Sequence, residues 1–439
     1  MNSPVGVRTR PASGEDGGTG AAKPAEDEAD ERTTALQTVV VVGASLAGLR
    51  ATEALRRDGF DGRIVLVGAE RHLPYDRPPL SKQLLAGEWE PQELVLRRAP
   101  YDELELDLRL GVRATALDAA GKVLTLDLGD GTHEELAFDG ALLATGATPR
   151  TLPNTPDLDG IFVLRTVDDA LDLRARLDDH PRVVVVGAGF IGSEVAATCR
   201  GRGLQVTVLE ALPAPLVRGL GETLGMVCGE LHRDHGVDLR LGVGVAAIEG
   251  DGTVERVRLD DGSTVDADVV VVGVGVVPVT DWLEGSGLTL DNGVVCDETL
   301  LAAPGIVAAG DVARWPNPMF DGELMRLEHW TNAAEQGVAA ARRLLVTDDA
   351  EAVPYAPVPF VWSDQYDRKI QTVGHFRGDD DMEVVHGTLE ERRFVAVFGR
   401  HGRLVGALGF SMPAKVMQYR KMIEERASFE DALERARAS

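Results

Sequence analysis

One short pattern occurs twice in this chain: a β-branched run, a glycine-rich turn and a helical stretch. The first copy joins residues 38–42 to Gly43-Ala-Ser-Leu-Ala-Gly48, and the second joins residues 183–186 to Gly187-Ala-Gly189-Phe-Ile-Gly192. Glycines at these positions permit a tight turn and let a pyrophosphate approach the unpaired N–H groups of the helix N-terminus. The duplication therefore predicts two Rossmann-like nucleotide-binding units in one chain.

The elements that follow each glycine turn also repeat in the same order. Helical patterns cover residues 49–57 and 193–202, second strands cover 64–67 and 205–209, hairpins turn at Asp130-Gly131 and Asp261-Gly262, and closing strands cover 141–146 and 269–275. The second strands end near Glu70 and at Glu210, where an acid commonly accepts the hydroxyls of a ribose. A glycine turn alone is also explained by backbone needs, but four repeated elements favour nucleotide binding. The first copy departs from the pattern because Ser45 replaces the middle glycine.

Composition excludes several classes of function. With 71 acidic and 45 basic residues the net charge is -26, which opposes binding to nucleic acid or to anionic lipid. No apolar run approaches the roughly 20 residues of a membrane span, so membrane insertion is not expected. The three cysteines, Cys199, Cys228 and Cys296, have neither disulfide-motif nor metal-ligand spacing, so we predict no metal site.

The first 36 residues are rich in Gly, Ala, Pro, Glu and Asp and lack the apolar core of a secretory signal. We expect a disordered N-terminal tail over residues 1–36. The lack of a signal and the low cysteine content together favour a reducing, cytoplasmic location.

Five further motifs carry a resemblance to a known family. They are Leu73-Pro-Tyr-Asp-Arg-Pro-Pro-Leu-Ser-Lys82, Ala144-Thr-Gly146, Gly305-Ile-Val-Ala-Ala-Gly-Asp311, Glu328-His-Trp330 and Trp362-Ser-Asp-Gln-Tyr366. In this order they resemble the FAD-dependent ferredoxin reductases of the putidaredoxin reductase and rhodocoxin reductase type, which serve cytochrome P450 and Rieske dioxygenase systems. That family is a branch, without a redox disulfide, of the pyridine nucleotide-disulfide oxidoreductase superfamily.

The resemblance implies an α/β fold with two Rossmann-like domains, for FAD and NADH, and a C-terminal α+β interface domain. The alternation of strands after Pro357, notably 394–398 and 403–410 around His401-Gly402, agrees with the last of these. The expected boundaries are 37–152 for the first FAD segment, 153–282 for the NADH domain, 283–352 for the second FAD segment and 353–439 for the interface domain.

The resemblance also assigns site residues. Those expected to bind FAD or NADH are Gly43, Ser45, Ala47, Gly48, Glu70, Arg77, Lys82, Ala114, Thr145, Gly146, Arg150, Gly187, Gly189, Ile191, Gly192, Glu194, Glu210, Gly275, Gly310, Asp311 and Trp330. Lys82 corresponds to a lysine near the reactive edge of the flavin, Glu194 to an acid that can pair with it, and Trp362 to a tryptophan between the flavin and the partner protein.

Plainer explanations stay open for several of these residues. Lys82 and Glu194 can be solvated surface charges, Asp311 can be a helix N-cap, and Trp362 can be a core aromatic residue. His329 and Trp330 are explained equally well by packing.

Glu210 bears on the choice of nicotinamide cofactor. A carboxylate there accepts both ribose hydroxyls of NADH and repels the additional phosphate of NADPH. The next arginine along the chain is Arg218, whereas NADPH sites usually carry cationic groups directly after this strand. We therefore expect NADH.

Together these features predict a reductase that passes electrons from NADH through FAD to a ferredoxin of the 2Fe-2S or 3Fe-4S type. A disulfide reductase is disfavoured because the corresponding loop, residues 78–82, contains no cysteine. The alternatives are a rubredoxin reductase, an NADH oxidase of the same fold and a non-catalytic NADH-sensing flavoprotein resembling apoptosis-inducing factor. The sequence does not specify an oligomeric state.

Because an acidic reductase and an acidic ferredoxin repel each other, a local basic patch is expected near the flavin. The candidates are Arg342-Arg343, Arg368-Lys369 and Arg420-Lys421.

Overall fold

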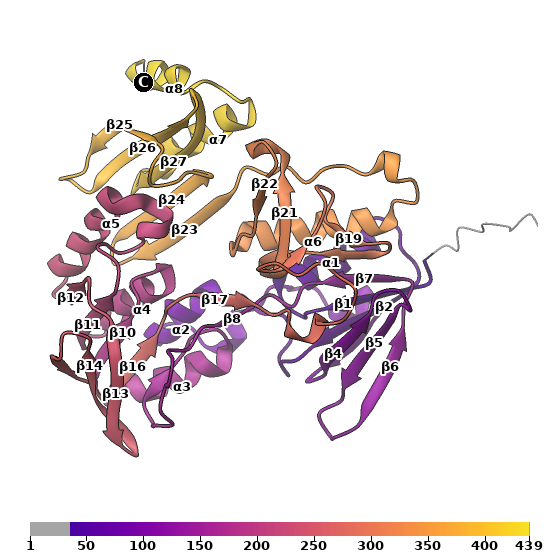
Figure 1. Ribbon diagram of the computed structural model, residues 1–439, viewed down its shortest axis with the longest axis horizontal. Helices are drawn as coiled ribbons and strands as arrows, with labels where there is room; N and C mark the ends of the chain where they lie inside the picture. Colours follow the sequence, from indigo (N-terminus) through magenta and orange to yellow (C-terminus); the bar gives the residue numbers. More distant parts are fainter. Residues whose placement is uncertain (1–35, 439) are drawn as a thin grey trace, which may run out of the picture. The chain divides into compact units, whose positions relative to one another are not determined.

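The computed structural model describes residues 36–438 (Figure 1). The tail expected over residues 1–36 therefore lies outside the described residues, apart from Leu36. Within the described part, no helix combines the length and the apolar character that a membrane span requires.

A six-stranded sheet is assembled from two separate stretches of chain. Its order is β19-β20-β7-β1-β2-β3, and its neighbours are parallel except for β19 with β20. The strands are β1 (Thr38–Val42), β2 (Arg63–Gly68), β3 (Leu106–Leu110), β7 (Gly140–Leu143), β19 (Leu301–Ala303) and β20 (Ile306–Ala308). The chain leaves this sheet after β7 and rejoins it at β19. Helices α1 (Leu46–Arg57) and α6 (Trp330–Leu345) pack against each other beside it (Figure 1).

The intervening chain builds a five-stranded parallel sheet of the same kind, in the order β12-β11-β10-β16-β9. Its elements are β9 (Ile161–Phe162), α3 (Val167–Leu177), β10 (Arg182–Val186), α4 (Phe190–Gly201), β11 (Gln205–Glu210), α5 (Val217–Asp234), β12 (Asp238–Leu241) and β16 (Val269–Val272). β10 lies between β11 and β16 just as β1 lies between β2 and β7, which is the duplication that the sequence predicts.

Each unit also carries a three-stranded antiparallel sheet. These sheets are β4 (Arg113–Asp118), β5 (Val123–Asp127) and β6 (His133–Ala137) in the first unit, and β13 (Val245–Asp251), β14 (Thr253–Leu259) and β15 (Thr264–Asp266) in the second. The predicted turns at Asp130-Gly131 and Asp261-Gly262 are confirmed, because they join β5 to β6 and β14 to β15. The two chain crossings between the units pair as β8 (Ala147–Pro149) with β17 (Val276–Pro278).

The C-terminal part is an antiparallel sheet in the order β23-β24-β27-β26-β25, with α7 (Pro413–Glu424) and α8 (Phe429–Arg437). Its strands are β23 (Phe360–Gln365), β24 (Arg368–Gly374), β25 (Asp381–Thr388), β26 (Arg393–Arg400) and β27 (Arg403–Phe410). The remaining elements are the short helix α2 (Gln83–Ala86) and a small sheet of β18 (Val294–Val295), β21 (Ala313–Asn317) and β22 (Glu323–Met325). The predicted fold class, two Rossmann-like units and a C-terminal α+β domain, is confirmed.

The paired glycines explain why the two turns have the same geometry. Gly43 has φ +121° and Gly187 has φ +100°, a region that residues with a side chain rarely adopt. A Cβ on Gly48 would lie 2.0 Å from the Gly43 carbonyl oxygen, and one on Gly192 would lie 2.1 Å from that of Gly187. The first turn of each helix therefore packs directly on the glycine turn that precedes it.

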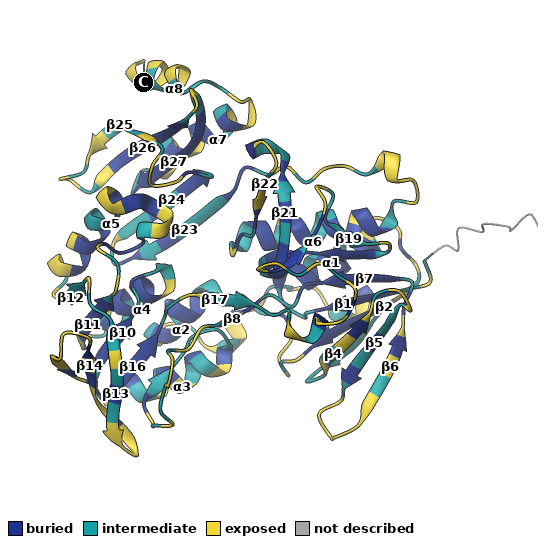
Figure 2. Ribbon diagram, in the orientation of Figure 1, coloured by how far each residue is buried: buried dark blue, intermediate teal, exposed yellow. Residues whose placement is uncertain are grey.

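The helices begin earlier than the sequence predicts. α1 starts at Leu46 and α4 at Phe190, each three residues before the predicted start. The reason is that the apolar residues between the glycines already form the first helical turn, directly after Ser45 and Gly189. The central strands β1 and β10 are buried apart from their first residues, and Figure 2 shows buried residues in dark blue. In the second unit, α3 and α4 cover one face of the parallel sheet and the antiparallel sheet β13–β14–β15 covers the other.

Candidate active site

A cavity of about 1120 Å³ lies where the carboxyl ends of the two parallel sheets open toward each other. The predicted residues that line it are Ser45, Ala47, Glu70, Arg77, Lys82, Thr145, Gly146, Gly187, Gly189, Ile191, Gly192, Glu194, Glu210, Gly275, Gly310, Asp311, Trp330 and Trp362. Residues from three distant parts of the sequence are thus brought to one site.

Four predicted residues do not line this cavity. Gly43 and Gly48 shape the backbone of the first turn behind it. Ala114 lies on β4, opposite Leu126 of β5. Arg150 instead donates from Nε to the Val276 carbonyl oxygen at 3.2 Å, where the two chain crossings pair.

Both glycine turns present an open helix N-terminus to the cavity. Neither Ser45 before α1 nor Gly189 before α4 caps its helix with a side-chain hydrogen bond, and neither first turn holds an acidic residue. Such N-termini attract anions through unpaired N–H groups and the helix dipole. Two dinucleotides, each with a pyrophosphate, fit this pair of turns.

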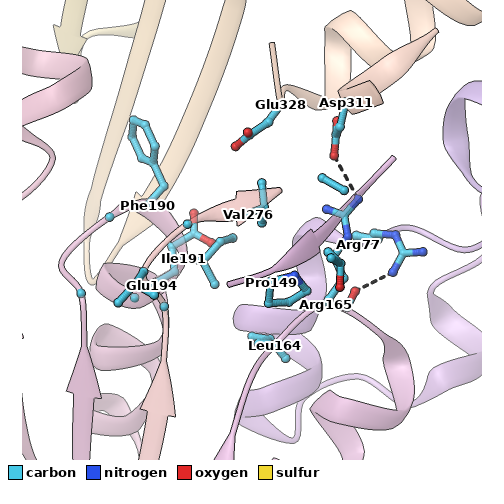
Figure 3. Close-up of a pocket in the computed structure, with 18 of the residues that line it drawn as sticks. Arg77, Pro149, Leu164, Arg165, Phe190, Ile191, Glu194, Val276, Asp311 and Glu328 are labelled. Atoms are coloured by element: carbon cyan, nitrogen blue, oxygen red, sulfur yellow. Dashed lines mark hydrogen bonds and ion pairs between the residues drawn. The ribbon is translucent and has the colours of Figure 1, made fainter. Parts of the chain in front are cut away.

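A chain of polar contacts crosses the cavity wall (Figure 3). Arg77 pairs with Glu70 at 2.5 Å. Arg77 also donates to the Arg165 carbonyl oxygen at 2.5 Å. The Arg165 guanidinium in turn pairs with Asp311 at 2.9 Å. The Tyr75 hydroxyl donates to the same Glu70 carboxylate, and burial raises the pKa of that hydroxyl. Glu70 and Asp311, both predicted to bind FAD, are therefore connected through two arginines.

Lys82 and Glu194 form an ion pair with 2.5 Å between Nζ and Oε2. They are not surface charges, because the side chains are only 15% and 4% exposed. The Ser81 hydroxyl donates to the same carboxylate oxygen at 2.6 Å, and the Ser363 hydroxyl donates to the other oxygen at 2.7 Å. One buried carboxylate on α4 therefore holds a lysine and two hydroxyls.

The aromatic residues at the cavity form a small cluster. The rings of Trp330 and Trp362 meet edge to face with centroids 6.1 Å apart, and the rings of Phe360 and Trp362 stack with centroids 6.0 Å apart. The Trp330 indole donates to Asp76 at 2.7 Å. Burial raises the pKa of Asp76, while this hydrogen bond and the charge of Lys82 act in the opposite direction. Trp362 lines the cavity and is not a fully buried core residue.

Glu210 is fixed at the end of β11 by two backbone donors. Its Oε2 accepts from the Ala188 N–H at 2.7 Å and its Oε1 accepts from the Leu212 N–H at 2.9 Å. Each oxygen has a second lone pair, so the carboxylate is held in one orientation with acceptor capacity left over.

Two polar atoms at the cavity are buried without a partner among the described residues, His329 Nδ1 and Arg326 Nε. Burial lowers the pKa of His329 to about 4, so its ring is neutral near pH 7. Because buried polar groups in native proteins are normally hydrogen-bonded, these atoms indicate a polar ligand in the cavity.

The predicted basic pairs differ from expectation. The prediction that Arg343 belongs to a basic surface patch is wrong. Its side chain is buried and is bound to Asp349 and Thr299. The other five basic side chains each lie within ion-pair distance of a carboxylate. These pairs are Arg342 with Asp58, Arg368 with Asp367, Lys369 with Asp364, Arg420 with Glu424 and Lys421 with Glu425. Each positive charge that the sequence offers for docking a ferredoxin is therefore paired with a carboxylate of the same chain.

Sequence reasoning gave no role to Arg165, Tyr75, Ser81 or Ser363. A signal existed for Arg165, which directly precedes the Thr166-Val-Asp-Asp169 capping box of α3, a pattern that fixes its backbone. Ser363 lies inside a recognised motif, but only the tertiary contact with Glu194 gives it a partner.

Comparisons with known proteins agree with this geometry. Residues 37–337 match the family described as pyridine nucleotide-disulphide oxidoreductase, and residues 360–436 match the one described as reductase C-terminal. The chain is 38% identical to a rhodocoxin reductase of Rhodococcus erythropolis over 88% of this chain and 89% of the relative. It is 40% identical to the anthranilate 1,2-dioxygenase system ferredoxin--NAD(+) reductase component of Burkholderia cepacia over 88% of this chain and 93% of the relative. The crystal structure of a covalent putidaredoxin reductase–putidaredoxin complex superposes with a TM-score of 0.83 at 33% identity, over 89% of this chain and 94% of the other.

Proposed function

The chain belongs to the pyridine nucleotide-disulphide oxidoreductase family and carries a reductase C-terminal domain, and from this premise we propose that it is an NADH-dependent, FAD-containing ferredoxin reductase. It passes electrons from NADH through FAD to a ferredoxin that serves a cytochrome P450 or Rieske-type oxygenase. The observation that carries the proposal is the pair of open helix N-termini facing one cavity, together with Trp362 at its edge.

The first unit, residues 37–152 and 283–352, holds FAD, and the second, residues 153–282, holds NADH. The N-terminus of α1 receives the FAD pyrophosphate, while Asp311 and Arg165 are the polar groups for the rest of that cofactor. The N-terminus of α4 receives the pyrophosphate of NADH, and Glu210 accepts its ribose hydroxyls.

When bound, FAD supplies the step between two-electron oxidation of NADH and one-electron reduction of the partner. The residues of the chain bind and orient the two cofactors and set the local charge. Lys82 places one cation at the junction of the two units, and Glu194 holds that cation in a fixed direction. Trp330 and Phe360 pack on Trp362 beside this junction.

No cysteine is placed at this site for thiol chemistry. The three cysteines are free and buried, and none lines the cavity. Burial raises the pKa of each thiol to about 12, which opposes formation of the reactive thiolate. The proposal therefore needs no redox disulfide.

We place the enzyme in the cytoplasm, where free thiols are stable.

The test is anaerobic reduction followed by addition of an acceptor. Purified protein should be yellow with bound FAD, and NADH should bleach it within seconds. Addition of an oxidised 2Fe-2S ferredoxin should then restore the colour rapidly. A colourless protein that does not take up FAD would contradict the proposal. A protein that bleaches but recovers only with oxygen is an NADH oxidase, and one that bleaches slowly and ignores both acceptors is an NADH sensor.

A further inference from the structure

The Glu194 carboxylate is held from three directions by residues that lie far apart in the sequence. Lys82 and Ser81 belong to the loop that follows the first Rossmann repeat, Glu194 lies on α4 of the second unit, and Ser363 lies on β23 of the C-terminal sheet. Ser363 is separated from Glu194 by 169 positions, and Lys82 by 112. The C-terminal domain thus contacts the Lys82–Glu194 pair through one hydroxyl.

The two oxygens of this carboxylate have different partners. Oε2 accepts from Lys82 and Ser81, whereas Oε1 accepts from Ser363 alone among the described residues. The carboxylate plane of a glutamate turns easily about its last torsion, so a donor at each oxygen is needed to fix it. Ser363 supplies the donor on the side away from Lys82.

Ser363 is itself fully buried and held in place. The Gln365 side chain, also buried, donates to the Ser363 hydroxyl oxygen at 3.4 Å, and the single proton of that hydroxyl is donated to Glu194. β23 packs against α4, as Figure 1 shows, which leaves little freedom for this contact to shift.

We infer that Ser363 is a positioning residue for the Lys82–Glu194 pair, so that electron entry from NADH depends on a hydroxyl of the C-terminal domain. Ser363 does not line the cavity, whereas Lys82, Glu194 and Trp362 do, so it acts through Glu194 and not by touching a cofactor. The inference rests on the proposed function, which places Lys82 at the junction of the two cofactors.

Adjacent residues of a strand point to opposite faces, so Trp362 and Ser363 share a backbone but face different neighbours. Trp362 faces the aromatic cluster at the cavity, and Ser363 faces α4. The strand that carries the tryptophan proposed to face the ferredoxin therefore also carries the hydroxyl that orients the pair on the NADH side.

Removing the Ser363 hydroxyl leaves one oxygen of a buried carboxylate without a donor, a change that costs more for a charged group than for a neutral one. In Ser363→Ala the carboxylate is free to rotate, and Lys82 loses its fixed direction. The rate of anaerobic bleaching by NADH should fall about tenfold, while the NADH concentration for half-maximal rate stays unchanged, because no group that binds NADH is removed.

A second readout does not depend on turnover. The midpoint potential of bound FAD, titrated without NADH or ferredoxin, should move to a more negative value in Ser363→Ala, because a displaced cation stabilises the added electrons less. Lys82→Ala is the reference variant and should shift the potential in the same direction. The double variant should bleach no more slowly than Lys82→Ala alone, since both changes act on one contact.

Two further variants keep the test decisive. Ser363→Cys fills the same space with a weaker donor and should give an intermediate rate, which also covers a failure of Ser363→Ala to fold. Ser411→Ala is the matched control, because Ser411 lies directly after β27 in the same domain and, among the described residues, its hydroxyl accepts only from the Lys369 backbone N–H, at 3.4 Å. It should behave as wild type.

Wild-type rate and potential in Ser363→Ala would overturn the inference, as would equal losses in Ser411→Ala or additive losses in the double variant. If Lys82→Ala bleaches slowly while Ser363→Ala does not, the inference alone fails and the proposed function stands. If Lys82→Ala itself retains wild-type rate and potential, the role of Lys82 in the proposed function fails together with the inference.

Discussion

Arg165 and Asp311, which lie 146 positions apart in the sequence, form an ion pair in the cavity wall with 2.9 Å between Nη2 and Oδ2. Arg165 comes from the start of the second unit, while Asp311 comes from the point where the chain has returned to the first sheet. Both units therefore contribute a charge to the place assigned to FAD, and the affinity for FAD should depend on both residues.

We predict that Asp311→Asn weakens FAD binding about tenfold, because it replaces a charged acceptor with a neutral one. The dissociation constant can be measured by adding FAD to apoprotein and following flavin fluorescence. Asp291→Asn is a suitable control, since Asp291 is an exposed partner of Arg314 outside the cavity. Equal affinities in Asp311→Asn and wild type would remove Asp311 from the FAD site.

Glu210→Arg should shift cofactor preference toward NADPH by about ten- to a hundredfold in kcat/KM, because phosphate repulsion is exchanged for attraction. The reaction with NADH should slow as well, since the variant also loses the two backbone contacts that fix Glu210. Glu210→Gln separates these effects, as it can keep one backbone contact without the cation. An unchanged ratio of NADH to NADPH efficiency in Glu210→Arg would place the ribose elsewhere.

Lys82→Ala should slow flavin reduction by NADH at least tenfold, because it removes the cation placed at the junction of the two cofactors and leaves Glu194 unpaired. Stopped-flow absorbance at saturating NADH measures this rate. Lys122→Ala removes another partly buried lysine, one that contacts the Asp139 carbonyl oxygen away from the cavity, and should have no effect on it. Full-rate reduction in Lys82→Ala with normal flavin content would contradict the assigned role.

Of the basic residues proposed to steer ferredoxin, Arg342 is the testable member of its pair because its side chain is 62% exposed. Arg342→Glu should raise the apparent KM for ferredoxin in cytochrome c reduction and leave NADH-to-ferricyanide turnover intact. The wild-type ferredoxin reaction should slow as salt rises from roughly 0.05 to 0.3 M, because screening shortens the reach of surface charge.

Arg343→Glu provides the contrasting case. It buries an unpaired acid beside Asp349, so it should reduce thermal stability and both activities together. Equal KM values for ferredoxin in Arg342→Glu and wild type would place the docking surface on another face.

His232 predicts a pH dependence of stability. Its ring is buried and shares a hydrogen bond with the Tyr366 hydroxyl at 2.8 Å, and burial lowers its pKa to about 4 from the ordinary value of 6.5. The unfolded chain therefore binds a proton more readily than the folded one in this range. Its contribution to stability is complete above about pH 6.5 and is lost as the pH falls toward 4.

Thermal melting at pH 7 and pH 5 measures this effect. The drop in melting temperature between the two values should be smaller in His232→Gln than in wild type, even though the variant is less stable at pH 7. His329 adds a similar contribution because burial lowers its pKa to about 4 as well. An identical pH dependence in His232→Gln would show that His232 does not titrate on unfolding.

The sequence alone predicted the two Rossmann-like units and the cofactor classes, and most of the site residues that it predicted line the cavity. These features were predictable because the constraints behind them are local. Gly43 and Gly187 must adopt positive φ. Gly48 and Gly192 must lack a Cβ, because the carbonyl oxygen of the turn lies against the first helical turn. Such requirements act over a few residues and so leave a readable pattern. The hairpin turns at Asp130-Gly131 and Asp261-Gly262 were predictable for the same reason.

Only the tertiary structure decided which charges are available and which are already paired. The sequence suggests that Arg343 is a surface cation, but its side chain is buried and pairs with Asp349. Arg165 gains an evident role only through its ion pair with Asp311. Likewise Ser363 acquires a partner only where β23 packs on α4. Ion pairs and hydrogen bonds between distant segments depend on how whole sheets pack, and no short stretch of sequence contains that information.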